Sequence, residues 1–162
     1  MPQAVTHVIL TIVLIDLYRH YFAKRKFPRY YVLIGGIAGL FPDIDMLIGW
    51  IYNFIFGTSY AFHGGITHIV LIPLAIFVFS IIAYKLKNRE LGLILAIVAF
   101  GWFFHLVLDC AFLGAYLPFW PFYTGGFCPH LISNTYMPGI DAIILIVWLV
   151  HEEVAHEIKD YI

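Results

Sequence analysis

Five long apolar runs organise this chain, and they constrain its fold more than any other feature. Only 12% of all residues are Asp, Glu, Lys or Arg, against about 25% in an ordinary soluble domain. Several apolar runs with so few charged residues are typical of a helical membrane protein. The sequence therefore predicts one all-α, multi-pass membrane domain over residues 1–162. The runs are 5–18, 30–41, 68–84, 91–108 and 140–150.

The basic residues indicate an orientation. All nine lie in residues 19–29, in residues 85–89 or at Lys159, which are stretches between or after the apolar runs. Because Lys and Arg favour the cytoplasmic side, we expect a protein of the cytoplasmic (plasma) membrane with its N-terminus outside and its C-terminus inside. The first run lacks a basic flank and a cleavage pattern, so we expect a retained helix and about five transmembrane helices.

The second run is too short to cross the membrane unaided. Residues 30–41 make about 18 Å of helix, whereas the hydrocarbon core is about 30 Å thick. We expect residues 46–56 to form a helix that lies on the outer face or re-enters, because a full crossing would move residues 85–89 outside. The net charge of −1 and the lack of a phosphate-binding loop argue against a nucleic-acid partner.

Seven ionisable residues lie in or beside the apolar runs, where such groups are costly and usually functional. Their spacing favours convergence: two carboxylates follow a proline that ends the short helix, and two histidines bracket a Gly-Gly turn. The last His and Asp lie four residues apart, on one helix face. The seven are His7, Asp43, Asp45, His63, His68, His105 and Asp109.

The predicted topology gives an independent test of convergence. Measured along the helices from the basic flank, residues from all four helices reach a depth of about 18 to 25 Å. Four His and three carboxylates near the outer leaflet are the composition of a binuclear or trinuclear transition-metal site. No thiolate is needed, which favours two or three catalytic Zn²⁺ or Mn²⁺ ions over a structural zinc site.

Other interpretations of the same residues remain open. A single intramembrane His often only bonds one helix to another, and paired Asp residues after a proline are usually a solvated turn. A non-catalytic divalent-metal binding or transport protein would use the same ligands, although transport favours a ladder of ionisable groups through the membrane. Below the cluster, only Asp16 offers such a step, and it is also expected to pair with Arg19 or His20.

The polar residues near the last helix carry weaker signals. The histidines of residues 151–156 are five apart and fail the HExxH zinc pattern, so we expect a solvated helix end there. Asp141 is expected as a helix-start carboxylate, with an additional role at the metal site left open. His130 is interpreted as a loop residue or a metal ligand. Cys110 and Cys128 both fall outside and form a disulfide if the compartment oxidises.

The order of these motifs resembles a known family. Thr-His at 6–7, Pro-Asp-Ile-Asp at 42–45, the His-Gly-Gly-Ile-Thr-His element at 63–68 and His-x-x-x-Asp at 105–109 are similar to those of the membrane-bound metal-dependent hydrolases, some of them LexA-regulated. The resemblance assigns the same seven residues to the metal site. One departure is Gly64, where the family usually has Arg. That family is distantly similar to zinc-dependent phospholipase C enzymes, which cleave phosphoesters at a multi-zinc centre.

The expected chemistry follows from the metal site and the resemblance. We expect hydrolysis of a phosphoester of a lipid or lipid-like substrate at the extracytoplasmic leaflet. Metal ions lower the pKa of a bound water towards about 7 and hold the phosphoryl oxygens. Asp43 or Asp45 is expected to bridge the ions and accept the proton of the water, as the catalytic carboxylate. The aromatic segment 116–127 is expected beside this site, and a soluble phosphoester remains an alternative substrate.

Overall fold

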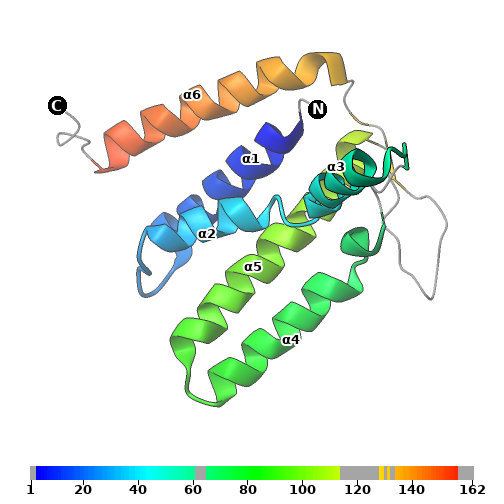
Figure 1. The fold of residues 1–162 in the computed structure, drawn as a ribbon. Coiled ribbons are helices and arrows are strands. Elements are labelled where there is room, and N and C mark those ends of the chain that lie inside the picture. Colours follow the sequence, from blue (N-terminus) through cyan, green and yellow to red (C-terminus); the bar gives the residue numbers. More distant parts are fainter. Residues whose placement is uncertain (1–2, 61–64, 114–127, 130, 132–133, 157–162) are drawn as a thin grey trace.

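The computed structural model describes residues 3–60, 65–113, 128–129, 131 and 134–156, and every regular element in these ranges is helical (Figure 1). The predicted all-α class is confirmed. Short π-helical or 3-10 segments flank several of the six α-helices. The elements are α1 Gln3–Leu17, η1 Tyr18–Phe22, α2 Tyr30–Ala38, α3 Ile44–Phe56, η2 Ile66–His68, α4 Leu71–Lys85, α5 Arg89–Leu108, η3 Asp109–Leu113, η4 Asn134–Tyr136 and α6 Met137–His156.

The helices follow the apolar runs closely. α1, α2, α4, α5 and α6 correspond to the five runs, and α3 corresponds to the segment expected on the outer face. α2 ends before Pro42, as predicted, and a tight turn leads directly into α3. The third run differs at its start, because His68 lies in η2 and α4 begins only at Leu71.

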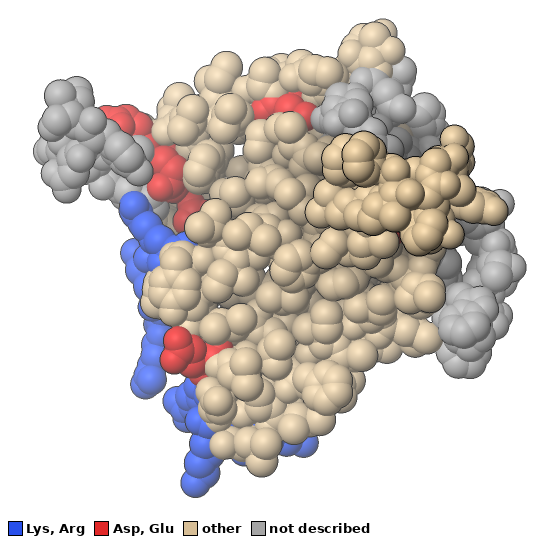
Figure 2. All heavy atoms as spheres, in the orientation of Figure 1, with Lys and Arg blue, Asp and Glu red and all other residues tan. Residues whose placement is uncertain are grey.

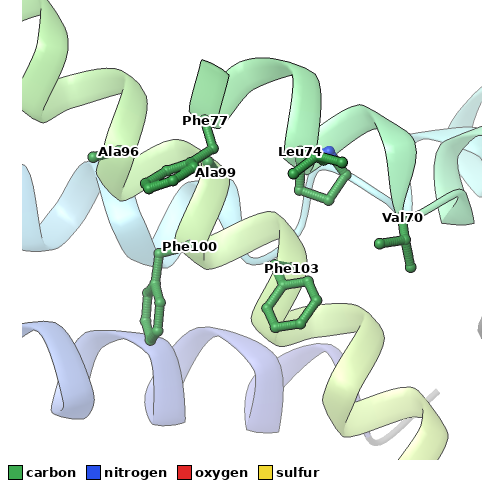
Figure 3. Close-up of a pocket in the computed structure, with 8 residues that line it drawn as sticks. Val70, Leu74, Phe77, Ala96, Ala99, Phe100 and Phe103 are labelled. Atoms are coloured by element: carbon green, nitrogen blue, oxygen red, sulfur yellow. The ribbon is translucent and has the colours of Figure 1, made fainter. Parts of the chain in front are cut away.

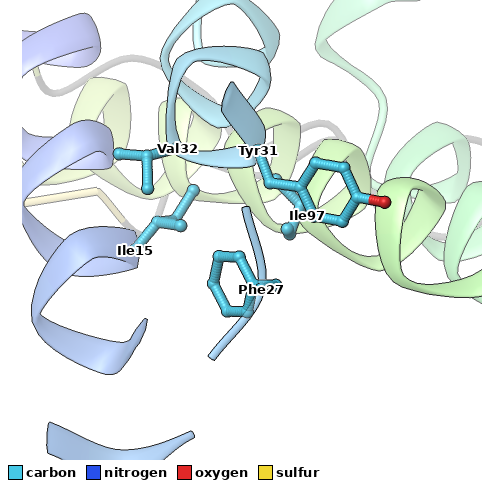
Figure 4. Packing of buried hydrophobic residues seen from close by; sticks show 5 residues of the cluster. All are labelled: Ile15, Phe27, Tyr31, Val32 and Ile97. Atoms are coloured by element: carbon cyan, nitrogen blue, oxygen red, sulfur yellow. The ribbon is translucent and has the colours of Figure 1, made fainter. Parts of the chain in front are cut away.

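The bundle is arranged around α5. This helix packs against α4 and α2, while α1 packs against α2 and α6. Figure 1 shows α6 along the outer edge of the bundle, beside α1. A buried cluster joins α1, α2 and α5 at one end of the bundle (Figure 4), and it consists of Ile15, Phe27, Tyr31, Val32 and Ile97.

A close approach of α2 and α5 positions the polar residues at the other end. A Cβ atom on Gly101 would lie 2.8 Å from the Gly35 carbonyl oxygen and 2.9 Å from the Ala38 Cβ. Small residues at such contacts allow two helix backbones to come close together. His105, one turn beyond Gly101, therefore reaches the C-terminal end of α2.

The helices connect a basic end of the bundle with a polar end. Thr6 bonds Asp141 at the starts of α1 and α6, and Tyr21 bonds His151 near their ends, so these two helices run in the same direction. Figure 2 shows the described Lys and Arg residues gathered along one edge of the molecule. They lie between the end of α1 and the start of α2, and between the last residue of α4 and the first residue of α5. Lys159 lies outside the described residues.

The expected number of membrane spans needs correction. Two helical stretches in the described part of the chain are long and apolar enough to cross a bilayer, Ala4–Phe22 and Arg89–Phe112, instead of about five. α2 has 9 residues and α4 has 15, which correspond to about 14 and 22 Å of helix. The 20 residues of α6 include the carboxylates of Asp141, Glu152 and Glu153.

A disulfide lies at the polar end. Cys110, just after α5, is bonded to Cys128, as the sequence allowed. The Leu131 backbone N–H also donates to the Ala111 carbonyl, which connects the segment around Leu131 to η3, just after α5. The aromatic segment 116–127 and His130 lie outside the described residues.

Candidate metal centre

Six of the seven predicted site residues meet at the polar end of the bundle, and the seventh, His63, lies outside the described residues. They come from separate elements: α1, the start of α3, η2 and the end of α5. A site with ligands from distant parts of the sequence requires the whole bundle to fold. The six are His7, Asp43, Asp45, His68, His105 and Asp109.

Asp109 is the centre of the group. Its Oδ1 lies 3.1 Å from His7 Nε2, and its Oδ2 lies 3.2 Å from His105 Nε2 and 3.5 Å from His68 Nε2. Asp109 is only 3% exposed, and the three imidazoles are also buried. One buried carboxylate thus faces three imidazoles from three elements.

The other two carboxylates approach this group from the start of α3. Asp43 Oδ1 lies 3.6 Å from His105 Nε2, and Asp45 Oδ2 lies 3.3 Å from His68 Nδ1. The Asp43 side chain is 22% exposed and Asp45 is buried. Asp43 is therefore the member of the group with the best access from outside.

The rings are also held against one another. His7 stacks on His105 with the ring centroids 3.9 Å apart, and His68 meets His105 edge-on at 5.5 Å. Such packing fixes where the ring nitrogens point. Preorganised ligands of this kind favour a metal over a loose hydrogen-bond cluster.

Hydrogen bonds from outside the group determine which ring nitrogen faces inward. His105 Nδ1 lies 2.7 Å from the carbonyl oxygen of Gly39, which only accepts, so Nδ1 carries the hydrogen and Nε2 presents its lone pair to the group. The Thr67 hydroxyl donates to Asp45 Oδ2 at 2.9 Å and therefore accepts from His68 Nδ1 at 3.1 Å. Partners of this kind orient metal-binding histidines in many proteins.

The donor set fits a transition metal. His105 Nε2 and Asp109 Oδ2 are fully buried and face each other at 3.2 Å, and in the described part of the protein neither makes a hydrogen bond of good geometry. Two overlapping sets of ligand atoms lie within 4.8 Å of one another, one from His7, His105 and Asp109 and one from Asp43, His68 and His105. Imidazole nitrogen with carboxylate oxygen suits Zn²⁺ or Mn²⁺. His105 Nε2 serves only one ion at a time, since Nδ1 is engaged by Gly39.

Several supporting residues were not predicted. Trp102 Nε1 donates to the Thr67 carbonyl at 2.9 Å and fixes the segment that carries His68. Thr6 donates to Asp141 at 2.7 Å beside His7, so Asp141 bonds α1 and is more than a helix-start carboxylate. Thr67 had a signal, since it stands within the histidine element. The Gly39 carbonyl had none, because a backbone acceptor leaves no trace in the sequence.

The basic end differs from expectation. The segment after residue 150 was expected to be solvated, but the side chains of His151 and Glu152 are only 21% and 13% exposed. Both approach Asp16, because α6 packs along α1. Arg19, an expected partner of Asp16, donates from Nε to the Phe27 carbonyl at 2.6 Å.

Comparison with known protein families gives a match. The family model described as YdjM inner membrane protein matches residues 1–158. No curated protein and no solved structure matches the chain significantly. The family match spans α1 to α6 and so includes all six residues of the centre.

Proposed function

The chain belongs to the family of YdjM inner membrane proteins, and from that premise we propose that it is a metal-dependent phosphoester hydrolase embedded in the membrane. The observation that carries this proposal is the buried Asp109 carboxylate within 3.5 Å of three imidazoles from three elements. Ionisable groups at membrane depth are costly, and a purely structural bundle has no need to gather six of them.

Each residue of the centre has a role in this proposal. His7, His68, His105 and Asp109 hold divalent ions, Zn²⁺ or Mn²⁺, together with Asp43 and Asp45. When bound, such ions supply an activated water near neutral pH and neutralise the phosphoryl oxygens. Asp43 is the carboxylate that accepts the proton of the attacking water, because it is the most exposed member of the group. Thr67 and Gly39 keep the ligand nitrogens pointing inward.

The surroundings of the centre favour a lipid substrate. A cavity of about 500 Å³ adjoins it between the start of α1, the end of α2 and the start of α3, and Asp43 is the polar residue in a lining that is otherwise apolar. Away from the centre, a second apolar cavity of about 280 Å³ lies between α4 and α5, and Phe77, Phe100 and Phe103 are among the residues that line it (Figure 3). Cavities of this character accept acyl chains more readily than a hydrated sugar or nucleotide.

The orientation follows from charge and sulfur chemistry. We place the basic end in the cytoplasm and the metal centre at the extracytoplasmic leaflet, as the positive-inside tendency requires. The Cys110–Cys128 disulfide lies at the same end as the centre, where an oxidising compartment would allow it. In this arrangement α1, α2, α4, α5 and α6 run alternately between the two sides, with α2 and α4 short of a full crossing on their own.

The second candidate is a protein that binds or transports a divalent metal without catalysis. The group of Asp16, His151 and Glu152 at the opposite end of α1 favours this candidate, because it would give a transported ion a second binding site. Between His7 and Asp16, however, α1 carries no ionisable residue, and the Thr11 hydroxyl donates its hydrogen bond to the His7 carbonyl. A path for ions would need polar groups in that interval.

Hydrolysis of lipid phosphoesters by the purified full chain tests the proposal. The substrates are detergent-dispersed phospholipids and phosphatidic acid, with p-nitrophenyl phosphate as the soluble comparison. Asp109→Asn should lower kcat/KM about 100-fold or more. Glu90→Gln makes the same chemical change at the exposed, opposite end of α5 and should leave the rate near that of the wild type.

The outcomes separate the candidates. Loss of activity with a chelator and its return with Zn²⁺ or Mn²⁺ supports the hydrolase, and a preference for dispersed lipid supports the substrate class. Equal rates for Asp109→Asn and Glu90→Gln would refute it. Bound metal with no turnover of any phosphoester would favour the binding or transport protein instead.

A further inference from the structure

A second group of metal-ligand side chains lies at the basic end, where α1 and α6 meet. One carboxylate oxygen of Asp16, one ring nitrogen of His151 and one carboxylate oxygen of Glu152 all lie within 4.8 Å of one another. Asp16 is nine residues after His7 in α1, a separation of about 14 Å along the helix. This group is therefore separate from the centre around Asp109.

Asp16 is a buried member of this group. It is only 4% exposed, and its buried Oδ2 accepts no hydrogen bond from the described part of the protein. A buried carboxylate oxygen without a donor is costly, since burial removes its water without replacing it. The Nε–H of Arg19, three residues later, donates its hydrogen bond to the Phe27 carbonyl.

His151 is oriented as a ligand by a residue outside the group. Its Nε2 lies 3.0 Å from the Tyr21 hydroxyl, and its Nδ1 faces Glu152 Oε1 at 3.8 Å. When Tyr21 accepts the Nε2 hydrogen, Nδ1 presents its lone pair towards the two carboxylates. Tyr21 belongs to the π-helical segment η1, a local widening that is frequent at functional sites.

We propose that Asp16, His151 and Glu152 bind a second divalent transition-metal ion, which fastens α6 to α1 at the basic end. Two carboxylate oxygens and one imidazole nitrogen suit Zn²⁺ or Mn²⁺. Among the described α-helices, α6 packs mainly against α1, so few other contacts hold it in place. An ion shared between the two helices would stabilise that contact.

Metal content in a background that weakens the first centre tests this site. Two double variants of the full chain are compared, and both carry Asp109→Asn. One carries Glu152→Gln as its second change, and the other carries Glu153→Gln. Glu153 is the neighbouring exposed carboxylate and serves as the matched control. After dialysis against Zn²⁺ and removal of free metal, the Glu152→Gln protein should hold one ion per chain fewer than the Glu153→Gln protein. Equal metal content in the two proteins would overturn the proposal.

Hydrogen exchange with Asp16, His151 and Glu152 all intact gives a second measurement, which does not depend on the folding of the Glu152→Gln protein. Adding Mn²⁺ to the metal-stripped Asp109→Asn protein should slow amide exchange in the last three turns of α6 by about tenfold or more. Exchange in α4, which lies away from this group, should change little. Unchanged exchange in α6 on addition of Mn²⁺ would refute the proposed site even if the hydrolase proposal stands.

Discussion

Thr67 provides a sharp test of how the metal centre is organised. Its hydroxyl donates to Asp45 Oδ2 at 2.9 Å and accepts from His68 Nδ1 at 3.1 Å, so one side chain fixes a carboxylate and a ring at the same time. Thr67→Val keeps the shape of the side chain and removes only this bridge. The Thr67 carbonyl, which accepts from Trp102, is unaffected.

The expected loss follows from the role of such supporting residues. Removing a hydrogen bond that orients a metal ligand typically weakens metal affinity 10- to 100-fold, which corresponds to about 1.4 to 2.7 kcal/mol. Competition between the detergent-purified protein and a fluorescent zinc chelator measures this directly. The wild-type fold should be retained, since no buried group of the bundle core is changed.

Thr58→Val is the matched control. Thr58 is also half-buried and its hydroxyl donates to Asn53 Oδ1 at 2.8 Å, but it lies beyond the end of α3. The zinc affinity of the Thr58→Val protein should equal that of the wild type. Equal affinity of the Thr67→Val and Thr58→Val proteins would refute the idea that this hydroxyl organises His68 and Asp45.

Three further predictions concern packing and orientation. Gly101→Ala should destabilise the protein by about 1 to 3 kcal/mol, because the new methyl meets the α2 backbone at 2.8 Å, whereas Gly139→Ala, with open space around it, should leave the thermal midpoint nearly unchanged. Ser80→Ala removes a 2.7 Å hydrogen bond to the α5 backbone and should cost about 0.6 kcal/mol in a denaturant titration. Cys110→Ser leaves Cys128 as a free thiol, which should react with a membrane-impermeant maleimide added to intact spheroplasts. Labelling only after permeabilisation would contradict the orientation.

The helices and the convergence of the polar residues were predictable because both depend on local pattern. Apolar runs bounded by basic stretches mark the helices, and Pro42 marks the end of α2. The position of each His or Asp along its helix then gives its depth. His7, His105 and Asp109 come together for that reason.

The number of full crossings was not predictable from hydropathy alone. A run of apolar residues shows that a segment avoids water, but it does not show how many of its residues become helical. η2 interrupts the third run before α4 begins, and the turn after Ala38 shortens the second. Two helical stretches, not five, consequently reach spanning length among the described residues.

Contacts between helices far apart in the sequence were the least predictable feature. The pairing of α1 with α6 brings Asp16 beside His151 and Glu152, and no periodicity within either helix specifies that pairing. The Gly39 carbonyl at His105 Nδ1 is a similar case, because it depends on how closely α2 and α5 approach. Such contacts require the assembled bundle.

Elemental analysis of the purified protein tests the central claim most directly. The full chain is measured in the Glu152→Gln background, so that only the centre around Asp109 contributes, with and without Asp109→Asn. The account predicts at least one Zn²⁺ or Mn²⁺ ion per chain when Asp109 is intact, and at least one ion fewer in the Asp109→Asn protein. Absence of bound metal from the folded protein with intact Asp109, or equal content in both, would contradict it.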